Sequence, residues 1–359
     1  MAAQSFTSRV ADFWAWFEAN EQQLEKYLAN LRNYDRGEVT GFLAAGLNRA
    51  IDDVTFETGG NHEVNLSPEG SLTLCFLTTY LVGAMPEKFR SKWLFTPWKT
   101  PAPKGFAVGM FGKTVSPGDV LARVFKDEES GFGVAFHSPA MAELGENEQY
   151  QLFYILLEAT LGENICLAHI SMVLMAEGPE PDMVPLPALP GAIRELAAAE
   201  GRELQENPCL SITAYSMEPE ESDEPRFDVV SGFTSLPDLL DSYYGDEDGP
   251  VCDLLEENGA KAGFILYDHG EENLADALEL RGEIAADLEK NVLGAPGSGR
   301  EIGVLLGQAV GEWNCYIDVL LYDEEAFLAA APAVLEKYGL DIDFSGFRQG
   351  GKGLCLTKM

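Results

Sequence analysis

Helical and extended patterns alternate along nearly the whole chain, and this alternation constrains the fold more than any single motif. In residues 5–31, apolar side chains recur at steps of three, four and seven, which places them on one face of a helix. Short apolar runs such as 131–137 and 263–267 have the length of buried strands. This alternation predicts an α+β protein, an α/β sandwich in which mainly antiparallel sheets are packed by helices.

The length of the chain predicts two folded lobes. Its 359 residues exceed one typical core and suit two, at about 100–200 residues per domain. A short acidic segment that contains prolines, residues 218–226, is the predicted linker. We therefore expect an N-terminal lobe over 1–217 and a C-terminal lobe over 227–359.

One internal similarity suggests that the two lobes are related. Leu156–Cys166 aligns without gaps to Leu305–Cys315, with five of eleven positions identical. Each stretch predicts a helix that ends at a glycine and leads into a strand, followed by an alanine-rich helix. The predicted repeat relates residues 156–204 to residues 305–338.

The charge of the chain limits the kinds of partner that it can bind. It has 24 basic and 59 acidic residues, a formal net charge of −35. Such a field repels nucleic-acid phosphates and anionic membranes, whereas it attracts a basic protein partner. The same surface charge is also typical of abundant soluble proteins that bind nothing in particular.

Other sequence features predict a cytoplasmic protein without a membrane segment. The N-terminus lacks the pattern of a secretory signal, and no run approaches the roughly 18 apolar residues of a membrane span. The six cysteines are scattered without a CxxC pair, which favours reduced thiols over disulfides.

Acidic residues are most concentrated in residues 218–257. This stretch holds fourteen Asp and Glu and a single basic residue, Arg226, interleaved with aromatic and leucine residues. The interleaving predicts a folded acidic face rather than a tail. The candidate partner-binding residues on this face are Asp238, Asp241, Tyr243, Tyr244, Asp246, Glu247 and Asp248.

A basic strip covers residues 88–113, where six Lys and Arg occur with no acidic residue between them. Aromatic residues alternate with these cations, a composition that can bind anions or single-stranded nucleic acid. In a chain of this charge, we instead expect the strip to contact the acidic second lobe or another subunit. The anion-binding alternative uses Lys92, Trp93, Trp98, Lys99 and His137.

No catalytic motif is complete. The glycine-rich loop 294–303 resembles a phosphate-binding loop, but Arg300 and Glu301 occupy the lysine and hydroxyl positions, which favours a mobile connector. The sequence contains no HExxH, CxxC or GxSxG, and residues 241–249 do not fit a calcium-binding loop. We therefore predict no catalytic residues, no cofactor and no resident metal.

Two resemblances add expectations. The stretch Phe13–Glu21, FWAWFEANE, resembles the opening FWxWFxxNE of a bacterial family of unknown function, and residues 55–59, 66–70 and 157–172 also match it. This resemblance implies a cytosolic protein and no catalytic residues. Residues 334–347 are similar to the C-terminus of acidic ribonuclease E inhibitors but differ at its Asp and Trp positions, which implies ferredoxin-like topology rather than shared activity.

Three hypotheses follow. The leading one is a non-enzymatic regulatory or immunity-type protein that binds a basic partner through the second lobe. An enzyme or small-ligand protein is the first alternative, with a site between the lobes built from His137, the basic strip and the glycine loop. A structural homo-oligomer is the second alternative.

Overall fold

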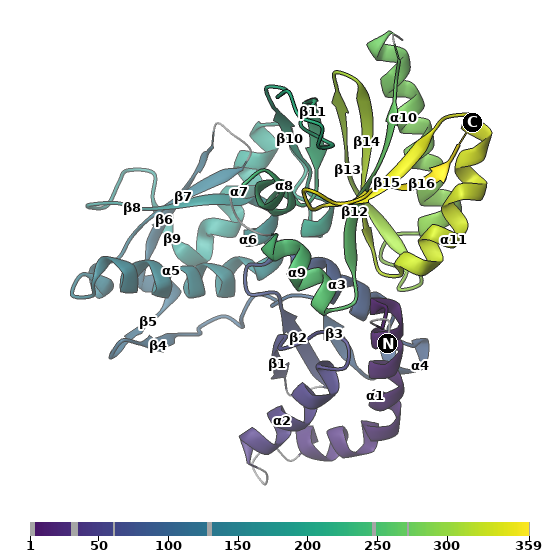
Figure 1. The fold of residues 1–359 in the computed structure, drawn as a ribbon. Helices are drawn as coiled ribbons and strands as arrows, with labels where there is room; N and C mark the ends of the chain where they lie inside the picture. Colours follow the sequence, from purple (N-terminus) through teal and green to yellow (C-terminus); the bar gives the residue numbers. More distant parts are fainter. Residues whose placement is uncertain are drawn as a thin grey trace.

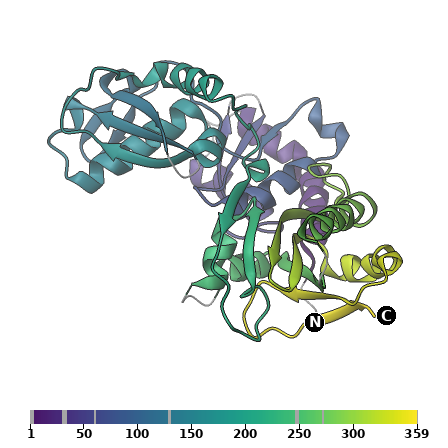
Figure 2. The same ribbon diagram turned by 90° about the horizontal axis from the view of Figure 1, so that it is seen from above.

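The computed structural model shows an α+β fold with mostly antiparallel sheets. The structure describes residues 4–29, 35–59, 62–127, 131–245, 249–270 and 273–358. A four-stranded sheet with its helices projects away from a larger seven-stranded sheet, and the N-terminal helices lie beside the larger sheet (Figures 1 and 2). The predicted fold class is confirmed.

The N-terminal part combines helices with a small sheet in the order β1-β2-β3. Its third helix, α3, begins where the Ser71 hydroxyl accepts a hydrogen bond from the Leu74 N–H at 3.2 Å. The strand β3 is parallel to β2, and the other pair is antiparallel. The elements are α1 (Phe6–Ala29), α2 (Arg36–Leu47), β1 (Thr55–Gly59), β2 (Glu63–Ser67), α3 (Leu72–Gly83), α4 (Glu87–Arg90) and β3 (Leu94–Thr96).

The four-stranded sheet has the order β8-β7-β6-β9, and two helices, α5 and α7, share its core. The rings of Phe136 on the sheet and Phe153 on α5 stack with centroids 4.0 Å apart. Two preceding strands, β4 (Val108–Met110) and β5 (Lys113–Val115), form a separate antiparallel pair. The other elements are β6 (Leu121–Lys126), β7 (Phe132–His137), α5 (Glu146–Leu161), α6 (Glu163–His169), β8 (Ile170–Met175), β9 (Val184–Pro185) and α7 (Leu189–Ala199).

The seven-stranded sheet is antiparallel throughout, with the order β10-β11-β13-β14-β12-β15-β16. Its elements are β10 (Thr213–Ser216), β11 (Val229–Thr234), α8 (Pro237–Tyr244), α9 (Pro250–Glu257), β12 (Lys261–Asp268), α10 (Leu274–Leu288), β13 (Gly303–Gly311), β14 (Asn314–Leu321), α11 (Glu324–Leu335), β15 (Ile342–Gly346) and β16 (Leu354–Thr357). The succession β12-α10-β13-β14-α11-β15 with the spatial order β13-β14-β12-β15 is ferredoxin-like topology. The expected ferredoxin-like element therefore occurs in the C-terminal part.

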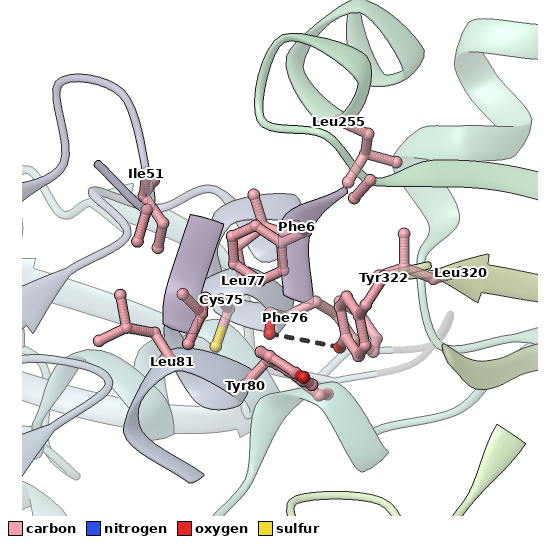
Figure 3. Packing of buried hydrophobic residues seen from close by; sticks show 14 of the residues in the cluster. Phe6, Ile51, Cys75, Phe76, Leu77, Tyr80, Leu81, Leu255, Leu320 and Tyr322 are labelled. Carbon is pink, nitrogen blue, oxygen red and sulfur yellow. Dashed lines mark hydrogen bonds between the residues drawn. The ribbon is translucent and has the colours of Figure 1, made fainter. Parts of the chain in front are cut away.

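Helices cover both faces of the seven-stranded sheet. The helices α10 and α11 share a core with one face, while α8, α9 and the N-terminal helices share a second core with the other. Phe6 lies at this second junction, with its ring centroid 5.5 Å from Tyr80 and 5.7 Å from Tyr322 (Figure 3). The Tyr322 hydroxyl donates to the Phe76 carbonyl at 3.4 Å (Figure 3). The two predicted lobes therefore share one core.

The predicted linker lies inside one sheet. Residues 218–226 connect β10 to β11, which are antiparallel neighbours. The Met217 N–H donates to the Val230 carbonyl at 3.0 Å, and the Glu220 N–H donates to the Phe227 carbonyl at 2.8 Å. The segment thus continues a hairpin, and strands on both sides of it belong to the same sheet.

The two stretches of the predicted repeat have different secondary structures. Leu156–Cys166 forms the end of α5 and the start of α6, whereas Leu305–Cys315 forms most of β13 and the start of β14. The helix predicted at 304–310 is wrong because β13 is buried on both faces, which leaves an apolar run without strand alternation. The sequence similarity does not correspond to a repeated structural unit.

Candidate partner-binding site

The predicted acidic face divides into exposed carboxylates and inward-pointing tyrosines. Asp238 and Asp241 lie one turn apart on α8, and both residues are exposed to solvent. Partial burial of the Asp238 carboxyl group, and then the Asp241 carboxylate, raise the pKa of Asp238. Tyr243 is 3% exposed, and its hydroxyl donates to the Pro225 carbonyl at 2.7 Å. Asp246, Glu247 and Asp248 lie outside the described residues.

The placement of Tyr243 and Tyr244 corrects their predicted role. The half-buried Tyr244 donates its hydroxyl to the Arg226 carbonyl at 2.9 Å. Both side chains therefore hold the connection between β10 and β11 against α8. Their hydroxyl groups form hydrogen bonds inside the protein because α8 packs with this face toward the sheet.

Arg226 anchors the same connection from inside. It is fully buried and pairs with the carboxylate of Asp318 on β14, and its Nη2 donates to the Tyr215 hydroxyl at 3.0 Å. Its guanidinium lies 4.7 Å from the ring centroid of Phe347, in a wall of aromatic rings. Burial alone lowers the pKa of Arg226, but Asp318 reverses this and raises it. The cluster fixes the position of the acidic connection.

In the described residues, Lys88 and Lys92 of the basic strip pair with carboxylates of α1, and Lys113 pairs with Glu143. Lys92 forms ion pairs with Glu21, at 3.0 Å, and with Glu25. Trp93 is buried, and its indole N–H donates to the same Glu21 carboxylate at 3.1 Å. Carboxylates of α1 therefore neutralise the lysines at positions 88 and 92 within the fold, while contact of the strip with another subunit stays a prediction.

The remaining anion-binding candidates do not converge with Lys92. Trp98 packs against the core shared by the N-terminal helices. The Lys99 backbone N–H donates to the buried carboxylate of Glu163 at 3.0 Å, which explains the position of that segment. His137 ends β7 in the four-stranded sheet. Trp98 and Lys99 thus lie beside the N-terminal core, whereas His137 is part of the four-stranded sheet.

Hydrogen bonds to the carboxylate of Glu301 fix the conformation of the glycine loop. Glu301 is 1% exposed and accepts hydrogen bonds from the Gly297 N–H and the Ser298 hydroxyl at 2.8 Å and from the Arg300 N–H at 2.9 Å. A Cβ on Gly299 would lie 2.1 Å from the backbone N of Ala84. The loop therefore packs on the end of α3, and the Glu301 carboxylate occupies the position that a bound phosphate would take. It is not the mobile connector that the sequence predicts.

An acidic pocket lies where two turns of the seven-stranded sheet meet. Val229 at the start of β11 pairs with Gly311 at the end of β13, and the Glu312 N–H donates to the Asp228 carbonyl at 2.9 Å. This pairing brings the β10–β11 connection beside the β13–β14 turn. We call the resulting cavity of about 610 Å³ the Trp313 pocket; it is lined by Pro219, Glu220, Glu221, Ser222, Asp223, Asp228, Glu312 and Trp313.

The Trp313 pocket combines negative charge with an accessible aromatic ring. Five carboxylates line it, and its described lining contains no lysine or arginine. Trp313 is 66% exposed, and the Asp228 carboxylate fixes its backbone by accepting the Trp313 N–H at 3.1 Å and the Asn314 N–H at 3.0 Å. Such a pocket can hold an organic cation by charge attraction and by contact with the face of the indole.

Glu312 and Trp313 are not among the partner-binding residues predicted from the sequence. The available signal was the stretch Gly311–Asn314, in which a tryptophan occurs between two apolar runs, as at a turn. Because residues 304–310 were predicted as a helix, this turn was not recognised as part of a hairpin.

A second cavity of about 550 Å³ lies beside α5. It is mostly apolar and is lined in part by Pro101, Lys104, Phe106, Pro117, Pro187 and Pro190. Neither His137 nor the glycine loop contributes to its lining. The site proposed between the lobes from those residues is therefore not this cavity.

Comparisons with protein-family models, curated proteins and solved structures found no match to this chain. Within the described ranges, no group of three or more His, Cys, Asp and Glu side chains is placed to hold a metal ion. Among the same residues, no helix combines the length and apolar character that crossing a membrane requires.

Proposed function

We propose that this chain is a non-enzymatic binding protein that recognises a basic protein partner through the Trp313 pocket. The observation that carries the proposal is that five acidic residues and one strongly exposed tryptophan line the same pocket. Exposed tryptophans are enriched at interfaces because they supply a large apolar contact area and a polar N–H. An arginine side chain of the partner fits this chemistry because its guanidinium stacks on aromatic rings and pairs with carboxylates.

The pocket is preorganised for this role. Buried Arg226 and its partner Asp318 hold one wall, and Asp228 holds the turn that carries Trp313. A rigid site loses little conformational entropy on binding. The net charge of −35 adds long-range attraction, which increases the association rate with a basic partner.

A fluorescent oligo-arginine peptide tests the proposal. We expect it to bind the full chain with an affinity that falls steeply between about 0.05 and 0.5 M salt, because salt screens the exposed carboxylates. Trp313→Ala removes the cation–π contact and should cost about 1 kcal/mol, or about fivefold in affinity. Glu220→Gln with Glu221→Gln should also weaken binding.

A matched variant separates the pocket from net charge. Glu279→Gln with Glu283→Gln removes the same number of exposed carboxylates from α10. If these changes weaken peptide binding as much as the changes at Glu220 and Glu221, recognition depends on overall charge and the pocket has no special role. Absence of binding at low salt would also reject the proposal.

We place this protein in the cytoplasm. The support is its cysteine usage, since the six cysteines are free and four of them are buried. Fractionation of cells that express the full chain tests this location.

A further inference from the structure

The strand β8 forms an open edge of the four-stranded sheet. It runs parallel to β7, with Phe132 beside Ile170 at one end and Phe136 beside Met175 at the other. Within the described part of the chain, no strand pairs with its other side. The sheet to which β8 belongs projects away from the seven-stranded sheet (Figures 1 and 2).

The outward backbone groups of β8 can be assigned from one hydrogen bond. The Ala176 N–H donates to the Phe136 carbonyl at 2.8 Å, so the alternate residues Val173 and Met175 direct their N–H groups away from β7. The Met175 N–H donates instead to the Tyr150 hydroxyl of α5 at 3.2 Å. Val173, at the middle of the edge, directs its N–H and carbonyl outward, and such groups favour pairing with another strand.

Apolar side chains border the same edge. Val173 is buried in the core beneath α5, whereas Met172 and Leu174 point to the opposite face and are 38% and 44% exposed. Tyr154 is 46% exposed and lies one turn along α5 from Tyr150, which contacts β8. The edge therefore combines unpaired backbone groups with an apolar border.

The charge distribution indicates what covers this edge. Proteins usually protect edge strands with lysine, proline or inward charges, but β8, with the sequence ISMVLM, carries no charge and no proline. A net charge of −35 makes two copies repel each other, and this repulsion is weakest where an uncharged strand such as β8 forms the contact. A basic partner, in contrast, is attracted to the acidic surfaces elsewhere.

We infer that two copies of this chain pair through β8 about a two-fold axis to form one continuous sheet. The strands run antiparallel and are centred on Val173, which exchanges two N–H···O bonds with Val173 of the second copy. In this register Met172 lies opposite Leu174 of the second copy, and both become covered. This surface is separate from the Trp313 pocket, so the two proposals can fail independently.

Sedimentation of the full chain tests the inference. We expect a species of twice the 39.1 kDa chain mass whose population rises with salt, because screening reduces the repulsion between two acidic copies. Salt has the opposite effect on binding of a basic partner. Met172→Lys with Leu174→Lys introduces like charges across the axis and should convert the dimer to monomer.

A matched pair of substitutions controls for a general effect of lysine. Leu210→Lys with Ile212→Lys changes residues that are 51% and 66% exposed and precede a different edge strand, β10; the dimer should persist. Hydrogen exchange provides a second measurement, since the Val173 amide should be protected in the dimer and exchange faster on dilution. A monomer at all salt concentrations, or a dimer that survives lysines at 172 and 174, would overturn the inference.

Discussion

Replacing Asp318 with Asn should lower the free energy of unfolding of this protein more than any single surface change does. Arg226 is 0% exposed and Asp318 is 1% exposed, so the substitution leaves a buried guanidinium without its counter-charge. Breaking one partner of such a pair costs about 3–5 kcal/mol. The Tyr215 hydroxyl and the surrounding rings still contact the guanidinium, which places the expected loss near the lower limit, about 3 kcal/mol.

Urea unfolding followed by circular dichroism measures this loss. With a denaturant dependence of about 3 kcal/mol per molar urea for a chain of this size, the midpoint should fall by about 1 M. Asp253→Asn breaks the exposed ion pair with Arg348 and should cost only about 0–1 kcal/mol. It serves as the control for removal of one acidic charge.

A double replacement separates pairing from packing. Arg226→Met with Asp318→Leu removes both charges, and such hydrophobic replacements are commonly neutral or stabilising. We therefore expect the double variant to recover most of the stability lost in Asp318→Asn. A midpoint shift in Asp318→Asn no larger than in Asp253→Asn would refute the reasoning, because it would mean that water screens the pair.

Three further changes test other parts of the fold. Gly299→Ala should lower the urea midpoint by the equivalent of about 1–3 kcal/mol, because Gly299 has φ +66° and a Cβ would meet the backbone of Ala84; an unchanged midpoint would show that the loop is not docked. Burial, and then the nearby Glu163 carboxylate, raise the pKa of Glu158 in the folded state above its value in the unfolded chain. The protonated Glu158 side chain therefore contributes stability that is fully present below the pKa of the unfolded chain and is lost as pH rises through the pKa of the folded state. Glu158→Gln should therefore raise the melting temperature at neutral pH and leave it unchanged below about pH 4; equal effects at both values would contradict this sign. Phe136→Ala, at a fully buried position, should cost about 3–5 kcal/mol by urea unfolding, and a loss under about 1 kcal/mol would contradict the packing.

Much of the secondary structure follows from local pattern. Residues 5–31 have a helical repeat of apolar side chains, and Phe6–Ala29 of this stretch forms α1 with its polar face exposed. The runs at 131–137 and 263–267 form β7 and β12. These elements were predictable because neighbours three, four or two positions apart decide which face is apolar.

The spacing of apolar residues predicted the wrong secondary structure where a segment is buried on all sides. Residues 303–311 form β13 at the centre of a sheet, so their sequence shows neither strand alternation nor a polar helical face. Because this strand was predicted as a helix, the β13–β14 turn and its exposed Trp313 were not predicted. Local spacing cannot distinguish these cases because burial on both faces removes the periodic signal.

What the sequence determined by itself is the α+β class, the order of most helices and strands, and the excess of negative charge. The places where that charge is exposed depend on tertiary contacts: Tyr243 and Arg226, predicted to be parts of a surface and a linker, are buried, whereas Trp313 is exposed. The pairing of β11 with β13 brings residues 219–228 beside residues 312 and 313. The physical reason is that helix and strand periodicity depends on near neighbours, while strand pairing and burial depend on contacts between residues far apart in the chain.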